Sequence, residues 1–286
     1  MRRILTHNGT YMHSFGAILI AVAASYLALL GLLYAFQGQL VYFPMREIVA
    51  TPRDRGLDFE DVYLETEDGV RLHGWFVPAA PERAVLLYFH GNAGNLSYRV
   101  ERTKVFHDLG LSVLALDYRG YGRSAGRPSE EGTYRDARAA WRYLAETRRI
   151  APDRIVLFGR SLGAAVAAQL AVDTAPRALI LDSAFTSAVD LGAAVYPWLP
   201  VRLLARYRYP TLENLKQVNR PVLIVHSRND EIVPFRHGEA LYAAANPPKV
   251  FLEIAGGHND DFFVRDRRYA DGLDAFLAEV LKSARP

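Results

Sequence analysis

The residues best suited to chemistry are a serine, an aspartate and a histidine that follow one another at long intervals along the chain. Ser161 is the centre of a G-x-S-x-G pattern, with a strand-like run (155–158) before it and an alanine-rich run after it. This strand–turn–helix context is typical of a serine hydroxyl presented on a sharp turn, where glycines allow close chain approach. The N-terminus of the following helix also favours negative charge nearby. We therefore predict that Ser161 is a nucleophile for acyl transfer.

A second copy of the pattern is centred on Ser124. It lies beyond the end of a predicted strand and continues into Arg127 and Pro128, so that a loop follows it and not a helix. Because that context does not place the hydroxyl on a strand–helix bend, Ser124 is interpreted as a turn residue.

A serine hydroxyl needs a base, and the base needs an acid to orient it. When the nucleophile lies on a strand–helix turn, the acid and then the histidine follow it in the chain. Asp230 comes just past the strand-like run 222–226, and His258 just past the run 250–254. Both are therefore expected at the sheet edge that carries Ser161, with Asp230 as the acid and His258 as the base.

Other histidines and carboxylates fit these roles less well. The chain has eight histidines, and seven lie before the nucleophile, in predicted strands or helices, or in the loop after the third strand: His7, His13, His73, His90, His107, His226 and His237. For the acid, Glu231 adjoins Asp230, and Asp260 and Asp261 are close to His258. Asp230 is preferred because a carboxylate just past its strand matches the order of the triad.

Two backbone N–H groups are expected to stabilise an oxyanion. The first is that of Leu162, directly after the nucleophile. The second comes from the loop 90–95 after the third predicted strand, and we assign it to Asn92, with Ala93 as the alternative. His90 is expected to brace this loop.

The elements that must position these residues alternate between strand-like and helix-like runs. Apolar runs rich in Val, Ile and Leu are typical of strands covered on both faces. The predicted strands are 62–66, 72–77, 85–90, 113–118, 155–158, 178–181, 222–226 and 250–254, and the predicted helices are 130–147, 162–174, 235–245 and 261–281. The first two strands form a hairpin joined at 67–69. The pattern predicts an α/β fold with a mostly parallel eight-stranded sheet flanked by helices.

The stretch 185–219 interrupts this alternation, and we interpret it as a small helical lid over the edge of the sheet where ligands bind. Its large apolar side chains either receive an acyl chain or pack the lid itself: Phe185, Tyr196, Trp198, Leu199, Leu203 and Leu204. Its arginines either face anionic lipid headgroups or form a solvated surface: Arg202, Arg206 and Arg208.

An N-terminal segment, residues 15–36, is apolar and contains no charged residue. As a helix it would rise about 33 Å, which is enough to cross a hydrocarbon core of about 30 Å. A cleaved signal peptide would have a shorter apolar region, and a core helix would carry a polar stripe. Arg2 and Arg3 precede it, which favours a cytoplasmic N-terminus and an extracytoplasmic, periplasmic catalytic domain, although Arg46, Arg53 and Arg55 follow it.

The domain organisation follows from these elements. We predict a short N-terminal tail (1–14), a transmembrane helix (15–36), a linker (37–57) and a catalytic domain (58–286). The formal net charge of +3 is too small to indicate nucleic-acid binding. The absence of cysteine excludes disulfides, thiolate metal sites and a cysteine nucleophile. Neither a metal nor a cofactor is expected, because histidines at metal-ligand spacing and phosphate-binding glycine loops are absent from the sequence.

Several motifs in order resemble one group of the α/β-hydrolase superfamily, the N-terminally anchored hydrolase-domain proteins of bacteria and eukaryotes. The matching segments are HGNAGN, LDYRGYGRSAGRPSEEG, LFGRSLGAA, LDSAFTS, HSRNDEIVPFRHG and GGHND. The resemblance implies that the nucleophile, acid and base fall on Ser161, Asp230 and His258. Eukaryotic relatives include palmitoyl-protein thioesterases, but their cysteine-rich N-terminus is absent here, so that this specific role does not carry over.

We therefore predict a serine hydrolase that cleaves carboxylic esters or thioesters, with acylated or small-molecule substrates and a membrane anchor. A serine peptidase resembling the aminopeptidases shares this fold and triad and is the first alternative. A non-catalytic binding protein on the same fold is the second, although it would normally have lost a triad residue. Dehalogenases and epoxide hydrolases of this fold use an aspartate nucleophile, which Ser161 argues against.

Overall fold

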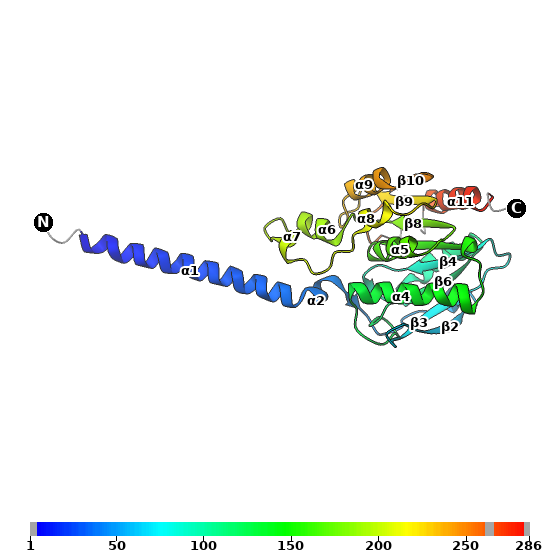
Figure 1. Ribbon diagram of the computed structural model, residues 1–286, viewed down its shortest axis with the longest axis horizontal. Coiled ribbons are helices and arrows are strands. Elements are labelled where there is room, and N and C mark those ends of the chain that lie inside the picture. Colours follow the sequence, from blue (N-terminus) through cyan, green and yellow to red (C-terminus); the bar gives the residue numbers. More distant parts are fainter. Residues whose placement is uncertain (1–4, 261–265, 283–286) are drawn as a thin grey trace.

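The computed structural model describes residues 5–260 and 266–282. A long helix, α1 (Leu5–Ala35), leads into a domain built on an eight-stranded sheet of order β10-β9-β8-β7-β4-β6-β3-β2. Figure 1 shows α1 projecting from one end of this domain, with helices on both faces of the sheet. The predicted α/β fold class is confirmed.

Neighbouring strands from β10 to β6 are parallel, and the last two pairs, β6–β3 and β3–β2, are antiparallel. The strands are β2 (Glu60–Glu65), β3 (Arg71–Val77), β4 (Ala84–Phe89), β6 (Leu111–Asp117), β7 (Ile155–Arg160), β8 (Ala178–Asp182), β9 (Val222–Ser227) and β10 (Lys249–Ile254). Each predicted strand is present within two residues of its expected bounds, and β2 and β3 form the predicted hairpin. The central strands are buried on both faces, which explains their continuous apolar sequences.

Two apolar layers cover the sheet. Alternate residues of β4 point to opposite sides: Leu87 joins the layer with α4 (Glu130–Arg142), α5 (Leu162–Asp173) and α9 (Arg236–Ala244). Tyr88 joins the layer with α3 (Val100–Asp108) and α11 (Arg267–Lys282). A π-helical turn (Tyr143–Thr147) continues α4, so that the predicted helix 130–147 is present with a changed final turn. The first residues of the predicted helix 261–281 lie outside the described residues.

The N-terminal helix α1 contains a 21-residue stretch, Phe15–Ala35, that is long and apolar enough to cross a membrane, and none of it is buried in the domain. A core helix would be mostly buried. The structure therefore argues against the alternative of a buried core helix for this segment.

The segment that the sequence predicts as a linker is hydrogen-bonded to the domain. It contains α2 (Gln37–Val41), the short strand β1 (Phe43–Pro44) and a 3₁₀ turn (Pro52–Arg55). Strand β1 pairs in parallel with β5 (Ala93–Gly94). Strand β5 comes shortly after the carboxyl-terminal end of β4 in the chain. The chain that leaves α1 therefore runs along the carboxyl-terminal edge of the sheet.

The predicted lid, 185–219, holds three short helices: α6 (Ala188–Val195), α7 (Val201–Leu204) and α8 (Thr211–Leu215). Ser187 caps α6, because its hydroxyl accepts a hydrogen bond from Asp190 N at 2.9 Å. Leu215 of α8 is buried in the layer that contains α5. In Figure 1, α6 and α7 lie at the end of the domain from which α1 emerges.

Candidate active site

Ser161 occupies the sharp turn between β7 and α5. Its φ of 53° and ψ of −116° place a non-glycine residue in a sparsely populated backbone region, which is a form of stored strain. A Cβ at Gly159 would lie 2.2 Å from the carbonyl oxygen of Gly163, and a Cβ at Gly163 would lie 2.1 Å from that of Phe89. The two glycines of the G-x-S-x-G pattern are therefore required because backbone passes directly over them.

Ser124, in the second copy of the pattern, has a different environment. It is fully buried, its hydroxyl donates to the carbonyl oxygen of Asp117 at 2.7 Å, and it accepts the N–H of His73 at 2.8 Å. The hydroxyl therefore joins a turn to β3, as expected of a turn residue.

Asp230 and His258 are brought together by the loops that follow β9 and β10. His258 Nδ1 lies 2.7 Å from Asp230 Oδ2, and both side chains are buried. Asp230 Oδ1 accepts the backbone N–H groups of Ile232 at 3.0 Å and Val233 at 2.6 Å. With both oxygens of the carboxylate bonded, the imidazole is oriented through Nδ1, and Nε2 is the ring atom left to accept a proton.

The ionisation of Asp230 reflects a competition between burial and bonding. Burial by itself raises the pKa of this carboxyl, but the hydrogen bond and charge of His258, together with the Val233 and Ile232 amides, outweigh it. The net effect lowers the pKa of Asp230 below its ordinary value. The site therefore keeps a negative charge beside the imidazole.

This lowered pKa predicts an acid-sensitive contribution to stability. A carboxyl whose pKa is depressed on folding stabilises the protein above its unfolded pKa of about 3.9, and this contribution disappears as the pH falls through the folded value. We expect the difference in unfolding free energy between wild type and Asp230→Asn to shrink as the pH drops below about 4. Thermal unfolding at several pH values measures it. The exposed Asp153→Asn is the control, and a difference that grows in acid would contradict the prediction.

Two of the alternative carboxylates, Glu231 and Asp260, hold the backbone of the His258 loop. Glu231 Oε2 accepts the backbone N–H of His258 at 2.9 Å, and Asp260 Oδ2 accepts that of Gly257 at 2.6 Å. Asp261 lies outside the described residues. His226 is buried, with Nε2 2.8 Å from the carbonyl oxygen of Val233.

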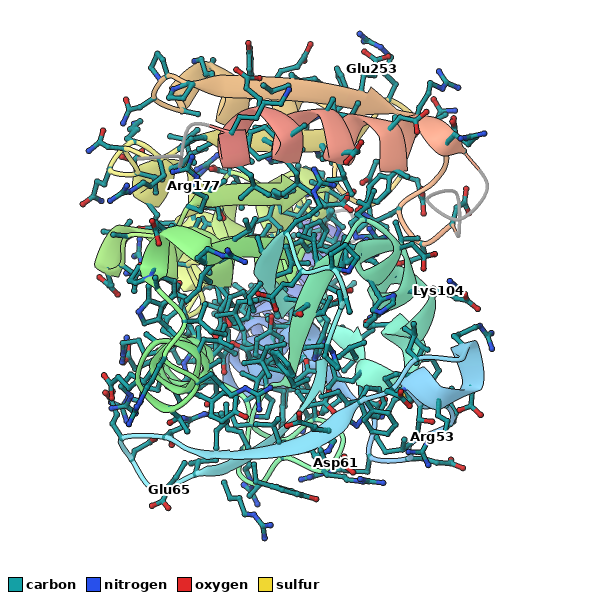
Figure 2. The ribbon with its side chains drawn as sticks, turned by 90° about the vertical axis from the view of Figure 1, so that its right-hand side faces the viewer. Arg53, Asp61, Glu65, Lys104, Arg177 and Glu253 are labelled. Atoms are coloured by element: carbon teal, nitrogen blue, oxygen red, sulfur yellow. The ribbon has the colours of Figure 1, made fainter. Side chains whose placement is uncertain are left out.

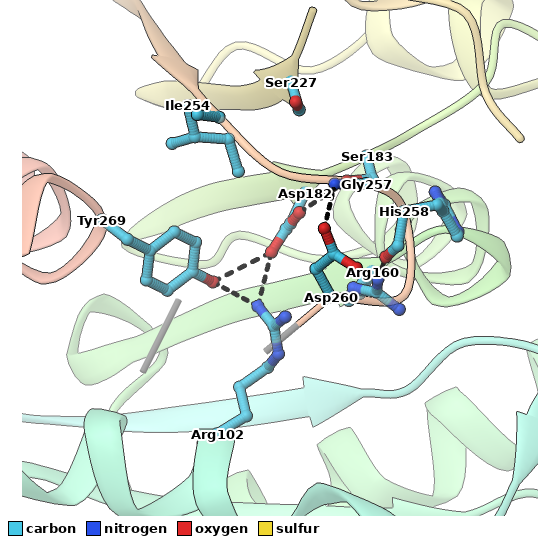
Figure 3. Close-up of a pocket in the computed structure, with 11 residues that line it drawn as sticks. Arg102, Arg160, Asp182, Ser183, Ser227, Ile254, Gly257, His258, Asp260 and Tyr269 are labelled. Carbon is cyan, nitrogen blue, oxygen red and sulfur yellow. Dashed lines mark hydrogen bonds and ion pairs between the residues drawn. The ribbon is translucent and has the colours of Figure 1, made fainter. Parts of the chain in front are cut away.

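Sequence reasoning missed a buried polar cluster behind His258. Asp182 Oδ2 lies 2.6 Å from Arg102 Nη1 and 2.9 Å from the Tyr269 hydroxyl. Arg160 donates from its guanidinium to the carbonyl oxygen of His258. Figure 3 shows these side chains around a cavity of about 20 Å³, which is room for about one water molecule. The only sequence signal was Asp182, an acid at the end of a predicted strand.

The loop after β4 lies against the nucleophile, since a Cβ on Gly91 would be 3.6 Å from Ser161 Cβ. Leu162 is the first residue of α5, where a helix leaves its N–H without an internal acceptor. Asn92 is held through both its side chain and its backbone carbonyl. Its side chain donates to the carbonyl oxygen of Val41 at 3.0 Å, and its carbonyl oxygen accepts the N–H of Phe43 at 3.0 Å. The segment after α1 thus fixes the expected oxyanion loop.

Ser161 and His258 are brought to the same sheet edge, but no hydrogen bond joins Ser161 Oγ to the imidazole among the residues that the structure describes. Arg160 directly precedes Ser161, and its side chain donates to the backbone carbonyl oxygen of His258. This bond holds the His258 loop beside the nucleophile turn. Hydrogen bonds of this kind are often long in the absence of substrate and tighten when it binds. The arrangement therefore brings together a strained serine and a carboxylate–imidazole pair.

The parallel sheet, the serine on its strand–helix turn and the carboxylate–imidazole pair past later strands define an α/β hydrolase. The chain belongs to the α/β-hydrolase superfamily. A family profile described as "Serine aminopeptidase, S33" matches residues 80–209. An uncharacterised protein of Mycobacterium tuberculosis is 43% identical, covering 92% of this chain and 94% of that one. The alpha/beta hydrolase domain-containing protein WAV2 of Arabidopsis thaliana is 36% identical, covering 90% of both.

Solved structures share the fold. An esterase of Pyrococcus furiosus superposes with a TM-score of 0.71 over 84% of this chain and 98% of its own, at 21% identity. An α/β hydrolase of Vibrio vulnificus superposes with a TM-score of 0.64 over 78% of this chain and 82% of its own, at 26% identity. These structures show that the domain has the α/β-hydrolase fold.

Proposed function

We propose that this protein is a serine hydrolase that cleaves carboxylic esters or thioesters through an acyl-enzyme, with Ser161, Asp230 and His258 as its catalytic triad. The observation that carries the proposal is the 2.7 Å contact between His258 Nδ1 and Asp230 Oδ2 at the sheet edge where Ser161 occupies its strained turn. The superfamily and the esterases among its structural neighbours support the same class.

In this mechanism, His258 Nε2 takes the proton of Ser161 Oγ as that oxygen attacks the carbonyl carbon. The N–H groups of Leu162 and Asn92 stabilise the oxyanion. The imidazolium, stabilised by the Asp230 carboxylate, returns the proton to the leaving alcohol or thiol, and an acyl-serine remains. Water then repeats the sequence and releases the carboxylic acid. All proton transfers use side chains of this chain, so that no cofactor is required.

The proposal also includes the side of the membrane on which the catalytic domain lies. The stretch Phe15–Ala35 is long and apolar enough to span a bilayer, and Arg2 and Arg3 precede it. The excess of positive charge on cytoplasmic segments then favours a domain on the extracytoplasmic, periplasmic side. Reporter fusions at the C-terminus test this orientation, because alkaline phosphatase is active only outside the cytoplasm.

A substrate series tests the activity directly. We expect the full-length protein in detergent to hydrolyse p-nitrophenyl esters and acyl thioesters, and to prefer them over aminoacyl anilides by about a hundredfold in kcat/KM or more. Amides have a poorer leaving group, and within 185–219 the structure holds only short helices and no large cap to select peptides.

The aminopeptidase alternative has one specific observation in its favour, the description of the family profile that matches residues 80–209. A reversed preference, with aminoacyl anilides cleaved faster than esters, would favour it. Failure to turn over or label with either class would instead favour a binding protein on this fold.

A further inference from the structure

The surface of the lid carries an apolar patch, which we call the lid tip (residues 195–204). Leu203 is 86% exposed and Trp198 is 58% exposed, and Val195 and Tyr196 are exposed beside them. A grouping of large apolar side chains on a surface typically marks a site that contacts another apolar phase or partner.

The lid tip contacts the N-terminal helix. The hydroxyl of Tyr26, inside the apolar stretch of α1, donates to the carbonyl oxygen of Trp198 at 2.9 Å. Closer to the domain, Gln37 donates to the carbonyl oxygen of Leu204 at 2.7 Å and accepts the N–H of Arg206 at 2.8 Å. Figure 1 shows α6 and α7 at the end of the domain where α1 joins it. The lid tip therefore has a defined position along α1.

That position lies well inside the apolar stretch. Tyr26 is nine residues before Ala35, the last residue of the stretch. At 1.5 Å per residue, this separation corresponds to about 14 Å along the helix axis. The hydrocarbon core is about 30 Å thick, so that Tyr26 is near its middle when the helix spans it and the adjoining lid tip is within one leaflet.

The charges around the lid tip fit a lipid surface. Residues 191–212 contain three arginines and no acidic residue, and one of these arginines, Arg202, is paired at 2.9 Å with Asp190, which directly precedes this range. The guanidinium of Arg206 lies 5.5 Å from the centre of the Tyr34 ring, at the end of the apolar stretch, where headgroups begin. The opposite end of the domain carries charges of both signs, and Figure 2 shows Asp61, Glu65 and Lys104 around its outline. Basic and aromatic residues next to an apolar surface are typical of interfacial membrane contact.

The expected oxyanion loop of the candidate active site is hydrogen-bonded to the segment that follows α1. Val41 and Phe43, directly after α1 and α2, hold Asn92 in the expected oxyanion loop. The lid follows β8, the strand beside that of Ser161 in the sheet. The segment after α1 and the lid therefore both adjoin elements of the candidate site.

We propose that the lid tip inserts into the leaflet next to the domain, and that the site takes its substrate from that leaflet, as an amphiphile whose acyl ester or thioester lies at headgroup depth. The substrate part of this inference rests on the proposed function. The insertion of the lid tip does not, because it depends on the apolar surface, on its contact with α1 and on α1 spanning the membrane.

The depth of the lid tip can be measured without any activity. The chain has no cysteine, so that Leu203→Cys carries a single environment-sensitive fluorophore such as NBD in the full-length protein, reconstituted in phosphatidylcholine vesicles. We expect blue-shifted emission that is quenched by doxyl-labelled lipids. Lys104→Cys, on a surface helix at the charged end, is the matched control and stays unquenched. Emission from Leu203→Cys that matches this control would overturn the insertion.

A kinetic comparison tests the route of the substrate. For Leu203→Asp, we expect the ratio of hydrolysis of a vesicle-embedded long-chain ester to that of a soluble short-chain ester to fall about tenfold or more, because a charge at this depth opposes insertion. An unchanged ratio would overturn the proposed route. If the wild type hydrolysed neither ester while the Leu203 label remained quenched, the proposed function would fail and the membrane contact would stand.

Discussion

Ser161→Ala is expected to abolish labelling by a fluorophosphonate probe and to lower kcat for ester hydrolysis by about 10⁴-fold or more. The hydroxyl that the strained turn presents is the atom that forms both the phosphonyl adduct and the acyl-enzyme. The substitution removes that oxygen and leaves the Asp230–His258 pair in place. Gel-based labelling of the full-length protein and a p-nitrophenyl ester assay measure the two effects.

Ser124→Ala is the informative control, because it removes the serine of the other G-x-S-x-G copy. We expect it to label at the same stoichiometry as wild type. It leaves the buried N–H of His73 without its acceptor, so that the free energy of unfolding falls by about 1–3 kcal/mol. If Ser124→Ala lost the label and Ser161→Ala kept it, the assignment of the nucleophile would be wrong.

The sheet and the order of the candidate triad were predictable from sequence for one physical reason. Strands covered on both faces must be continuously apolar, as β4 and β9 are, and the carboxyl ends of neighbouring parallel strands meet at one edge. Residues just past such strands therefore converge although they are far apart in the chain. Asp230 and His258 are 28 residues apart and lie 2.7 Å from each other. Their roles in catalysis remain predictions.

Contacts between irregular segments were not predictable, because no periodicity encodes them. The segment from Val41 to Phe43 is joined to Asn92, about fifty residues further along the chain, by individual hydrogen bonds. Two-residue strands such as β1 and β5 are too short to produce a recognisable pattern in the sequence. Arg102, Asp182 and Tyr269 come from α3, β8 and α11, and each is unremarkable in its own segment. The contact between the lid tip and Tyr26 was not predictable either, although the sequence predicts both the lid and the apolar helix.

Gly163→Ala should be among the most damaging single-methyl substitutions in the domain. The added Cβ would lie 2.1 Å from the carbonyl oxygen of Phe89 and 2.6 Å from that of His90, both of which are backbone atoms. To relieve this overlap, α5 must move away from β4, which carries the N–H of Leu162 away from the loop that holds Asn92. We expect a loss of about 3 kcal/mol or more in unfolding free energy. We also expect fluorophosphonate labelling of the folded fraction to slow by about a hundredfold, which is the effect of misplacing reacting groups by roughly 1 Å.

Gly192→Ala separates this steric effect from the general consequence of replacing a helical glycine. Gly192 lies in α6, and the nearest atom to its added Cβ is the side-chain methyl Val201 Cγ1 at 3.2 Å, which can shift. Alanine favours a helix over glycine by about 1 kcal/mol, so that Gly192→Ala should be neutral or slightly stabilising. Equal melting temperatures and labelling rates for the two variants would show that the close packing of α5 on β4 does not position the nucleophile. A large difference between the two variants in melting temperature and labelling rate would show that the strained turn depends on that packing. The same methyl group is added to a helix in both variants.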